Sequence, residues 1–214
     1  MSLLTPGPRP TLGPWGVDLH SGRILSGEQW DWLQANGCKF AWLRVDDAMS
    51  RLAKEASKRG IEVGVYAFLH PGSGKDQALH LLAELRRTQT PLGPHGLIAA
   101  DIEDTTTVGG HRWTAAENPA GVVTDFLDTV KRETSIVGFQ YTYRSFFKKH
   151  NLRVLSQMYK LWAADYNRDK SWEQLDAFDK NGFGAHVDVW QFGGGPIPPN
   201  HVVGVDKNLW RGDW

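Results

Sequence analysis

The sequence predicts an α/β fold, an irregular TIM-like (β/α) barrel of about eight strands whose last third has lost its helices. Two observations support this expectation. From residue 15 onward, short and nearly continuous apolar runs alternate with segments whose apolar residues recur at helical spacing, as in parallel strands covered by helices. After residue 150 the alternation weakens, and the Gly- and Pro-rich segment GGGPIPPN joins the last two apolar runs without a helix. A chain of 214 residues can form such a barrel as a single domain.

The first half of the chain shows strands and helices in regular alternation. The expected strands are WGVDLH (15–20), FAWLRV (40–45), VGVYAFL (63–69) and GLIAADIE (96–103). A capping box from Ser26 to Gln29 opens the first helix, which stops at Gly37. The next two helices carry apolar stripes at i, i+3, i+4 and i+7, namely Met49, Leu52, Ala53 and Ala56, and then Ala78, Leu81, Leu82 and Leu85.

The second half begins with a helix that is expected to open at Thr114, through a T-x-x-E box with Glu117. The remaining expected strands are IVGFQYTY (136–143), KLWAADY (160–166), VDVWQFG (187–193) and VVGVDKNLW (202–210). Residues 1–14, with four prolines, are expected to form an extended tail before one barrel domain at 15–214. A doubly wound sheet is the rival arrangement, but no strand is followed by the G-x-G-x-x-G turn of a dinucleotide-binding sheet.

Composition excludes several classes of function. The 24 basic and 24 acidic residues are mixed along the chain without a basic stripe, which argues against nucleic-acid binding. Membrane insertion is not expected, since no apolar run approaches the roughly 20 residues that span a bilayer. The N-terminal segment has neither the charged region nor the apolar region of a secretory signal. Cys38, the single cysteine, cannot form an intrachain disulfide and is expected to be a small buried core residue.

The candidate chemistry lies at the end of the fourth expected strand, GLIAADIED. Alternation of side chains places Ala99, Asp101 and Glu103 on one face, which is expected to point into the barrel and reach its C-terminal rim, where barrel enzymes assemble their sites. Two carboxylates separated by about 6.6 Å of backbone rise repel each other when both are ionised. One of them can then stay protonated near neutrality, as a general acid requires. The alternatives are a solvated strand end and an ion pair with a base such as Arg44.

Acidic and aromatic residues recur at the same end of other strands. Asp18 ends the first strand and Asp206 lies in the last, while Tyr66, Tyr141 and Trp162 lie on the third, fifth and sixth strands, with Tyr166 on the same face as Trp162. Carboxylates flanked by aromatic rings are typical of a glycan cleft, because such rings cover the apolar faces of sugars. His and Cys residues lack metal-ligand spacing and the G-x-S-x-G elbow is absent, so no metal, cofactor or serine nucleophile is predicted.

In chain order, the segments GVDLH, FAWLRVDD, VGVYAF, AADIED, FQYTYRSFF, LWAADY, VWQF and VGVDKN resemble the family 25 glycoside hydrolases. These are N-acetylmuramidases of phage endolysins and bacterial lytic enzymes, and the resemblance covers roughly residues 15–210. It implies a barrel of five β/α units followed by partly antiparallel strands. The implied activity is lysozyme-type hydrolysis of the β-1,4 bond from N-acetylmuramic acid to N-acetylglucosamine in peptidoglycan.

The resemblance also implies the roles of the site residues. Glu103 corresponds to the general acid, and Asp101 to the acid that assists attack on the anomeric carbon through the N-acetyl group of the substrate. The residues implied to bind substrate are Asp18, Asp206, Tyr66, Tyr141 and Trp162.

The chain departs from the family pattern in the second and third βα loops. The segment RVDDA places Arg44 and Asp47 where the family has Lys and Glu, and Ala67 stands where a His is usual. The loop after the second strand is also shorter, because a helix follows almost at once. The four acids are all present, so these changes bear on cleft depth and substrate detail.

Two other functions stay open at this stage. A chitinase-like hydrolase also ends a strand in D-x-E, but its longer acidic series needs Asp where this chain has Gly96 and Ala99. A non-catalytic glycan-binding module or degenerate barrel is favoured by the short second loop. The expected partner is bacterial cell-wall peptidoglycan, and the expected state is a monomer. Without a signal peptide, the protein is expected to be made in the cytoplasm and to act at the wall after release, as a phage lysin does, or to be extracellular.

Overall fold

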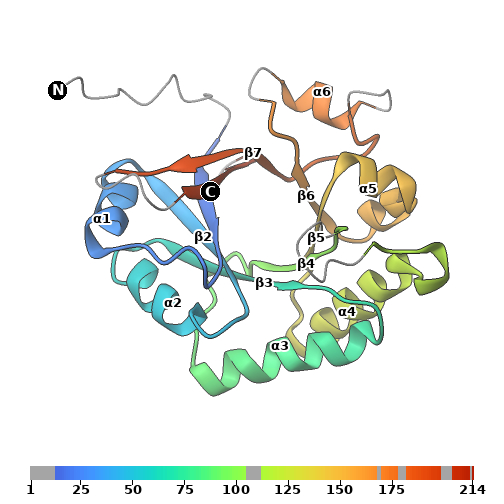
Figure 1. Ribbon diagram of the computed structural model, residues 1–214, viewed down its shortest axis with the longest axis horizontal. Coiled ribbons are helices and arrows are strands. Elements are labelled where there is room, and N and C mark those ends of the chain that lie inside the picture. The colour runs from blue at the N-terminus through green and yellow to red at the C-terminus, as the bar shows by residue number, and fades with distance from the viewer. Residues whose placement is uncertain (1–12, 105–111, 168–169, 178–181, 199–203, 213) are drawn as a thin grey trace.

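The computed structural model describes residues 13–104, 112–167, 170–177, 182–198, 204–212 and 214. Eight strands close into a barrel in chain order, and the helices lie outside it (Figure 1). The strands are β1 (Trp15–Leu19), β2 (Cys38–Arg44), β3 (Glu62–Phe68), β4 (Ile98–Asp101), β5 (Phe139–Tyr143), β6 (Lys160–Ala164), β7 (Val189–Pro196) and β8 (Gly204–Trp210). The helices are α1 (Gly27–Ala35), α2 (Met49–Ser57), α3 (Gly74–Thr88), α4 (Pro119–Thr134), α5 (Arg144–Lys149) and α6 (Trp172–Asp176), with 3-10 helices η1 (Ala115–Glu117) and η2 (Leu152–Gln157).

Seven strands run parallel, and β8 is antiparallel to both β7 and β1. The predicted α/β barrel is confirmed, as is the partly antiparallel end that the family resemblance implied. The alternation of strands and helices favoured parallel strands, and among the described strands β8 departs from this direction. A parallel crossover needs a dozen or more residues, and the stretch between β7 and β8 is shorter than that, so only an antiparallel return fits.

The first helix begins where its pattern predicts and the next two bury their predicted apolar stripes, but the fourth begins later than predicted. Ser26 and Gln29 form the expected capping box, with bonds of 3.3 and 3.0 Å between each side chain and the other residue's backbone N–H. The box at Thr114 caps the short η1 instead, so the prediction that α4 opens there was wrong. α4 begins at Pro119 with Asn118 as its N-cap. Proline favours this first helical position, because its ring fixes a helical φ and it lacks an N–H that would be unbonded there anyway.

Long helices stop at α4, as predicted for the last third of the chain, and among the described residues that follow only the short α5, η2 and α6 are helical. The expected tail largely concerns residues 1–12, which lie outside the described residues. Within the described part of the chain, no helix combines the length and apolarity needed to cross a membrane.

Two hydrophobic cores pack against the strands, one between the strands and the helices and one inside the barrel. The inner core consists of Phe40, Trp42, Tyr66, Leu97, Ala99, Phe139, Tyr141, Trp162, Ala164, Val189 and Trp210. Trp42 stacks on Trp162 with ring centroids 4.7 Å apart. Gly64 makes room for this packing, because a Cβ there would lie 3.1 Å from the Trp42 ring and 2.6 Å from Leu97. Cys38 is free and buried, as expected.

Candidate active site

The four acids predicted from the sequence meet at the C-terminal end of the barrel strands. Asp18 lies near the end of β1, Asp101 ends β4, and Glu103 follows two residues later. Asp206 lies near the start of β8, but the antiparallel direction of that strand brings it opposite Asp18 in the register. Ala99 belongs to the inner core, which confirms that this face of β4 points into the barrel.

Asp18 is buried and is held by two side-chain amides. Gln191 of β7 donates from Nε2 at 2.8 Å, and Asn208 of β8 donates from Nδ2 at 2.9 Å. Both bonds reach the same oxygen, Oδ2. Because β7 and β8 pair Gln191 with Asn208 directly, the hairpin places the two amides side by side against β1.

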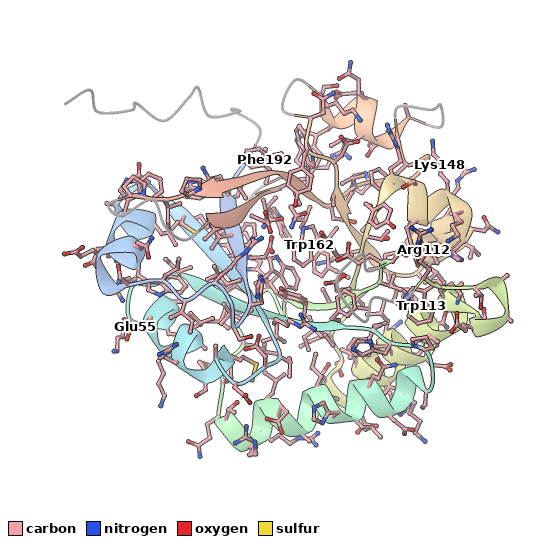
Figure 2. The ribbon with its side chains drawn as sticks, in the orientation of Figure 1. Glu55, Arg112, Trp113, Lys148, Trp162 and Phe192 are labelled. Carbon is pink, nitrogen blue, oxygen red and sulfur yellow. The ribbon has the colours of Figure 1, made fainter. Side chains whose placement is uncertain are left out.

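The same amides connect Asp18 to aromatic side chains. Gln191 Oε1 accepts hydrogen bonds from the hydroxyls of Tyr141 and Tyr166, each at 2.9 Å. Asn208 Oδ1 accepts a bond of 2.7 Å from Trp162 Nε1. Trp162 lies in the interior of the barrel (Figure 2), and its ring packs 4.5 Å from Tyr141 and 6.0 Å from Tyr66, centroid to centroid.

The predicted sugar-contacting aromatics therefore lie in the inner core rather than on an open surface. Tyr66 is 7% exposed, Tyr141 9% and Trp162 1%. Tyr66 and Tyr141 keep some surface for contact with a ligand, whereas the Trp162 ring mainly supports Trp42 and the amide network. Tyr166, just beyond β6, is 59% exposed.

Asp206 forms an ion pair with Arg23, which lies in the segment after β1. Its carboxylate also lies against the backbone of β7 at Gly194, where any Cβ would collide with Asp206 Oδ1. Glycine at this position is thus a condition for the placement of Asp206.

Asp101 is 5% exposed, and its Oδ1 has no hydrogen-bond partner among the described residues. Arg44 instead lies over the Phe68 ring at 5.1 Å. Within the described part of the chain Arg44 forms no ion pair, so the alternative that it neutralises Asp101 or Glu103 directly is not observed. Its charge lowers the pKa of both carboxyls from a greater distance.

Burial and mutual repulsion raise the pKa of three of these acids. Burial, followed by the charges of Asp18 and Asp206, raises the pKa of Glu103 to about 7. Burial and the charge of Asp206 raise the pKa of Asp18 to about 7, against the opposing effect of its two amide bonds. Burial and the charges of Glu103 and Asp18 raise the pKa of Asp101 well above its usual range. The site can therefore hold a transferable proton near neutral pH, as general acid catalysis requires.

The short second loop is fixed to the first by Asp46. Its Oδ2 accepts from the Ser21 N–H at 2.7 Å and its Oδ1 from the Ala48 N–H at 2.9 Å. Asp47, which stands where the family has Glu, is exposed. These two hydrogen bonds tie the loop after β2 to the loop after β1.

Sequence reasoning missed Gln191, Asn208 and Arg23. Gln191 stood in the recognised segment VWQF, and Asn208 lies two residues after Asp206 on the same strand face. A polar amide at an inward position of an apolar strand was the available signal for both. Arg23 follows β1 in an irregular segment, where the spacing of residues does not predict the direction in which a side chain points. In the described residues, no group of three or more His, Cys, Asp or Glu side chains is arranged for a metal ion.

We expect the free energy of unfolding to fall as the pH rises from about 4 to about 7. The folded-state pKa values of Asp18 and Glu103, about 7, exceed the ordinary values of 3.8 and 4.5. Between these limits the folded state binds more protons than the unfolded state, so this stabilisation is complete below about pH 4 and is lost by about pH 7. Each carboxyl contributes on the order of a few kcal/mol.

Denaturant unfolding of wild type and Glu103→Gln at pH 5 and pH 8 isolates the contribution of Glu103 from that of other groups. The variant should lose less stability between the two pH values than wild type. Equal losses in both proteins would contradict a raised pKa at Glu103.

A sequence profile described as "Glycosyl hydrolases family 25" matches residues 26–197. The fold is similar to a family 25 glycosyl hydrolase from Bacillus anthracis, at 17% identity and a TM-score of 0.70, covering 94% of this chain and 90% of that one. It is similar to a muramidase from Acremonium alcalophilum at 22% identity and a TM-score of 0.68, covering 94% of each chain. It is also similar to the modular autolysin LytC from Streptococcus pneumoniae, solved with a synthetic peptidoglycan ligand. The identity is 17% and the TM-score 0.71, covering 92% of this chain and 46% of that one. A search of curated proteins gave no match.

A closed α/β barrel that gathers two buried and two half-buried acids at the C-terminal end of its strands is an arrangement that carbohydrate-hydrolysing enzymes use. The profile covers most of the chain, and the protein belongs to glycosyl hydrolase family 25.

Proposed function

We propose that the protein is an N-acetylmuramidase, which hydrolyses the β-1,4 bond between N-acetylmuramic acid and N-acetylglucosamine in peptidoglycan. The observation that carries this proposal is the meeting of Asp18, Asp101, Glu103 and Asp206 at one end of the barrel, with burial and repulsion raising the pKa of Glu103 to about 7. The muramidase from Acremonium alcalophilum and the peptidoglycan-bound LytC share this fold, which supports the choice of substrate.

Glu103 acts as the general acid and donates its proton to the glycosidic oxygen as the C–O bond breaks. The acetamido oxygen of the N-acetylmuramic acid attacks the anomeric carbon of that sugar. The acetamido N–H bonds to Asp101, whose Oδ1 is buried without a partner in the described residues. While Glu103 holds its proton, one of the two charges that oppose ionisation of Asp101 is absent, and ionised Asp101 stabilises the positive charge that develops on the acetamido group. Glu103, now ionised, then takes a proton from the water that opens the cyclic intermediate, which restores the enzyme.

Asp18 and Asp206 supply further negative charge beside the anomeric carbon, where positive charge develops in the transition state. Tyr66 and Tyr141, which keep part of their surface exposed, contact the sugar. Peptidoglycan lies outside the cytoplasmic membrane, so on this proposal the enzyme acts at the cell wall after release or export.

Digestion of purified peptidoglycan tests the proposal through the new reducing ends. Soluble fragments are reduced with borohydride, hydrolysed, and analysed for reduced muramic acid and reduced glucosamine. Reduced muramic acid is the expected product. Reduced glucosamine would keep a glycosidase but overturn the choice of bond. Binding to walls of several types without release of any fragment would instead favour a non-catalytic glycan-binding module.

A further inference from the structure

Gln191 lies between the buried Asp18 and the exposed Tyr166, in contact with both. We propose that Gln191 is a positioning residue of this site, which ties the Asp18 carboxylate to the phenols of Tyr141 and Tyr166 and so holds it in place beside Glu103. This inference rests on the proposed function, and extends it to a residue that does not touch the reacting atoms.

The hydrogen bonds of Gln191 fix the direction of its amide. Its Oε1 accepts from two phenol hydroxyls at 2.9 Å, and its Nε2 donates to Asp18 at 2.8 Å. A flipped amide would turn its oxygen toward a carboxylate and its N–H groups toward the two phenols, which would lose the bond to Asp18. Gln191 is only 2% exposed, so water cannot readily replace a lost partner.

Asn208 holds the other side of Asp18 in a similar way. Its Oδ1 accepts from Trp162 Nε1, an indole N–H that can only donate, and this leaves its amide N–H to face Asp18. Each amide therefore acts as a clamp, that is, a side chain that holds Asp18 by a hydrogen bond, and the two clamps differ in their second partner. Asn208 bonds to Trp162, which is 1% exposed, whereas Gln191 bonds to Tyr141 and to Tyr166, which is 59% exposed. The Gln191 branch is therefore the one that a bound glycan can reach.

The Gln191 clamp acts on Glu103 through the charge of Asp18. Amide N–H bonds favour the ionised form of Asp18, and ionised Asp18 in turn disfavours loss of the Glu103 proton. The other charged groups facing these two acids are Asp206 of β8, Arg23 after β1, Arg44 of β2 and Asp101 of β4. The phenols of Tyr66, Tyr141, Tyr143 and Tyr166 also face these charges.

Two variants remove the clamp to different extents. Gln191→Met keeps most of the side-chain volume but removes all three hydrogen bonds, and should lower kcat/KM on peptidoglycan fragments about ten- to a hundredfold, as for loss of a hydrogen bond to a charged group. Tyr166→Phe removes one of the two phenol hydroxyls that bond to Gln191, a hydroxyl that also faces Asp206, and should lower kcat/KM by less. Gln140→Met is the matched control, since Gln140 is buried on β5 with its amide unbonded among the described residues.

The distinctive readout is the shape of the pH profile of kcat/KM. Without the clamp Asp18 holds its proton to higher pH, so less negative charge opposes ionisation of Glu103. In Gln191→Met the acid limb, which follows ionisation of Asp18, should therefore move to higher pH. The alkaline limb, which follows ionisation of Glu103, should move to lower pH. A merely structural role would scale the whole profile down without moving either limb, and that result would overturn the proposal. The Gln140→Met profile should keep both limbs in place.

A separate measurement keeps this inference distinct from the proposed function. The Asp18 carboxyl carbon is titrated by NMR in wild type and Gln191→Met, without any substrate. A higher midpoint in the variant supports the clamp even if wild type releases no muramic acid reducing ends. An unchanged midpoint would overturn the clamp even if wild type is a muramidase.

Discussion

Glu103→Gln is expected to reduce the rate of peptidoglycan hydrolysis by about a thousandfold, since general acid catalysis contributes roughly 10² to 10⁴. The amide keeps the size of the side chain but has no proton to give to the leaving oxygen. Glycan binding should persist, because the other three acids and the aromatic residues remain. Turnover is measured with soluble peptidoglycan fragments, and binding with the same fragments by calorimetry.

Glu133→Gln is the matched control for this variant. Glu133 lies near the end of α4, pairs with its neighbour Arg132, and has no contact with the acids of the barrel rim. Its substitution should leave turnover unchanged. If Glu103→Gln retained more than about a tenth of wild-type turnover, the assignment of Glu103 as the general acid would be wrong.

Asp101→Asn is expected to lower turnover by about a hundredfold and, at pH 8, to raise the free energy of unfolding by about 1–3 kcal/mol. The variant loses the negative charge that stabilises the acetamido group during attack. It also removes a carboxylate that burial and the charges of Glu103 and Asp18 oppose in the folded state. Opposite effects on activity and stability distinguish a working acid from a structural one.

Turnover and denaturant midpoints of Asp101→Asn are compared with those of Asp125→Asn, a substitution on the exposed face of α4. The control should change neither property by a comparable amount. Loss of both activity and stability in Asp101→Asn would show that Asp101 supports the fold through contacts of its own, and would remove it from the proposed mechanism.

Most of the fold could be predicted from the periodicity of side chains along the strands. Ala99 and Asp101 share an inward face because side chains alternate along a strand, and that rule needs no knowledge of partners. The same rule applied to the last strand placed Asp206 correctly only because β8 turns back, which brings its start to the end of β1. Periodicity gives no strand direction, and the short connection between β7 and β8 decided it.

The parts that escaped prediction depend on contacts between distant residues. The capping box at Thr114 is formed, but it caps the short η1, and the longer α4 begins at Pro119, five residues after Thr114. Gln191 and Asn208 are 173 and 190 residues from the Asp18 that they bind, so no local pattern reports their role. The burial of Trp162 likewise follows from stacking on Trp42, a contact between β6 and β2 across the barrel.

The central claim is that the four acids are arranged so that Glu103 keeps a proton near neutral pH and gives it to the substrate. The most direct measurement is the titration of the Glu103 carboxyl carbon by NMR in the free protein, set beside the pH profile of kcat/KM. The account predicts a midpoint near pH 7 that coincides with the alkaline limb, where activity is lost as Glu103 ionises. A midpoint near the ordinary value of 4.5, with activity still present at pH 6, would contradict it.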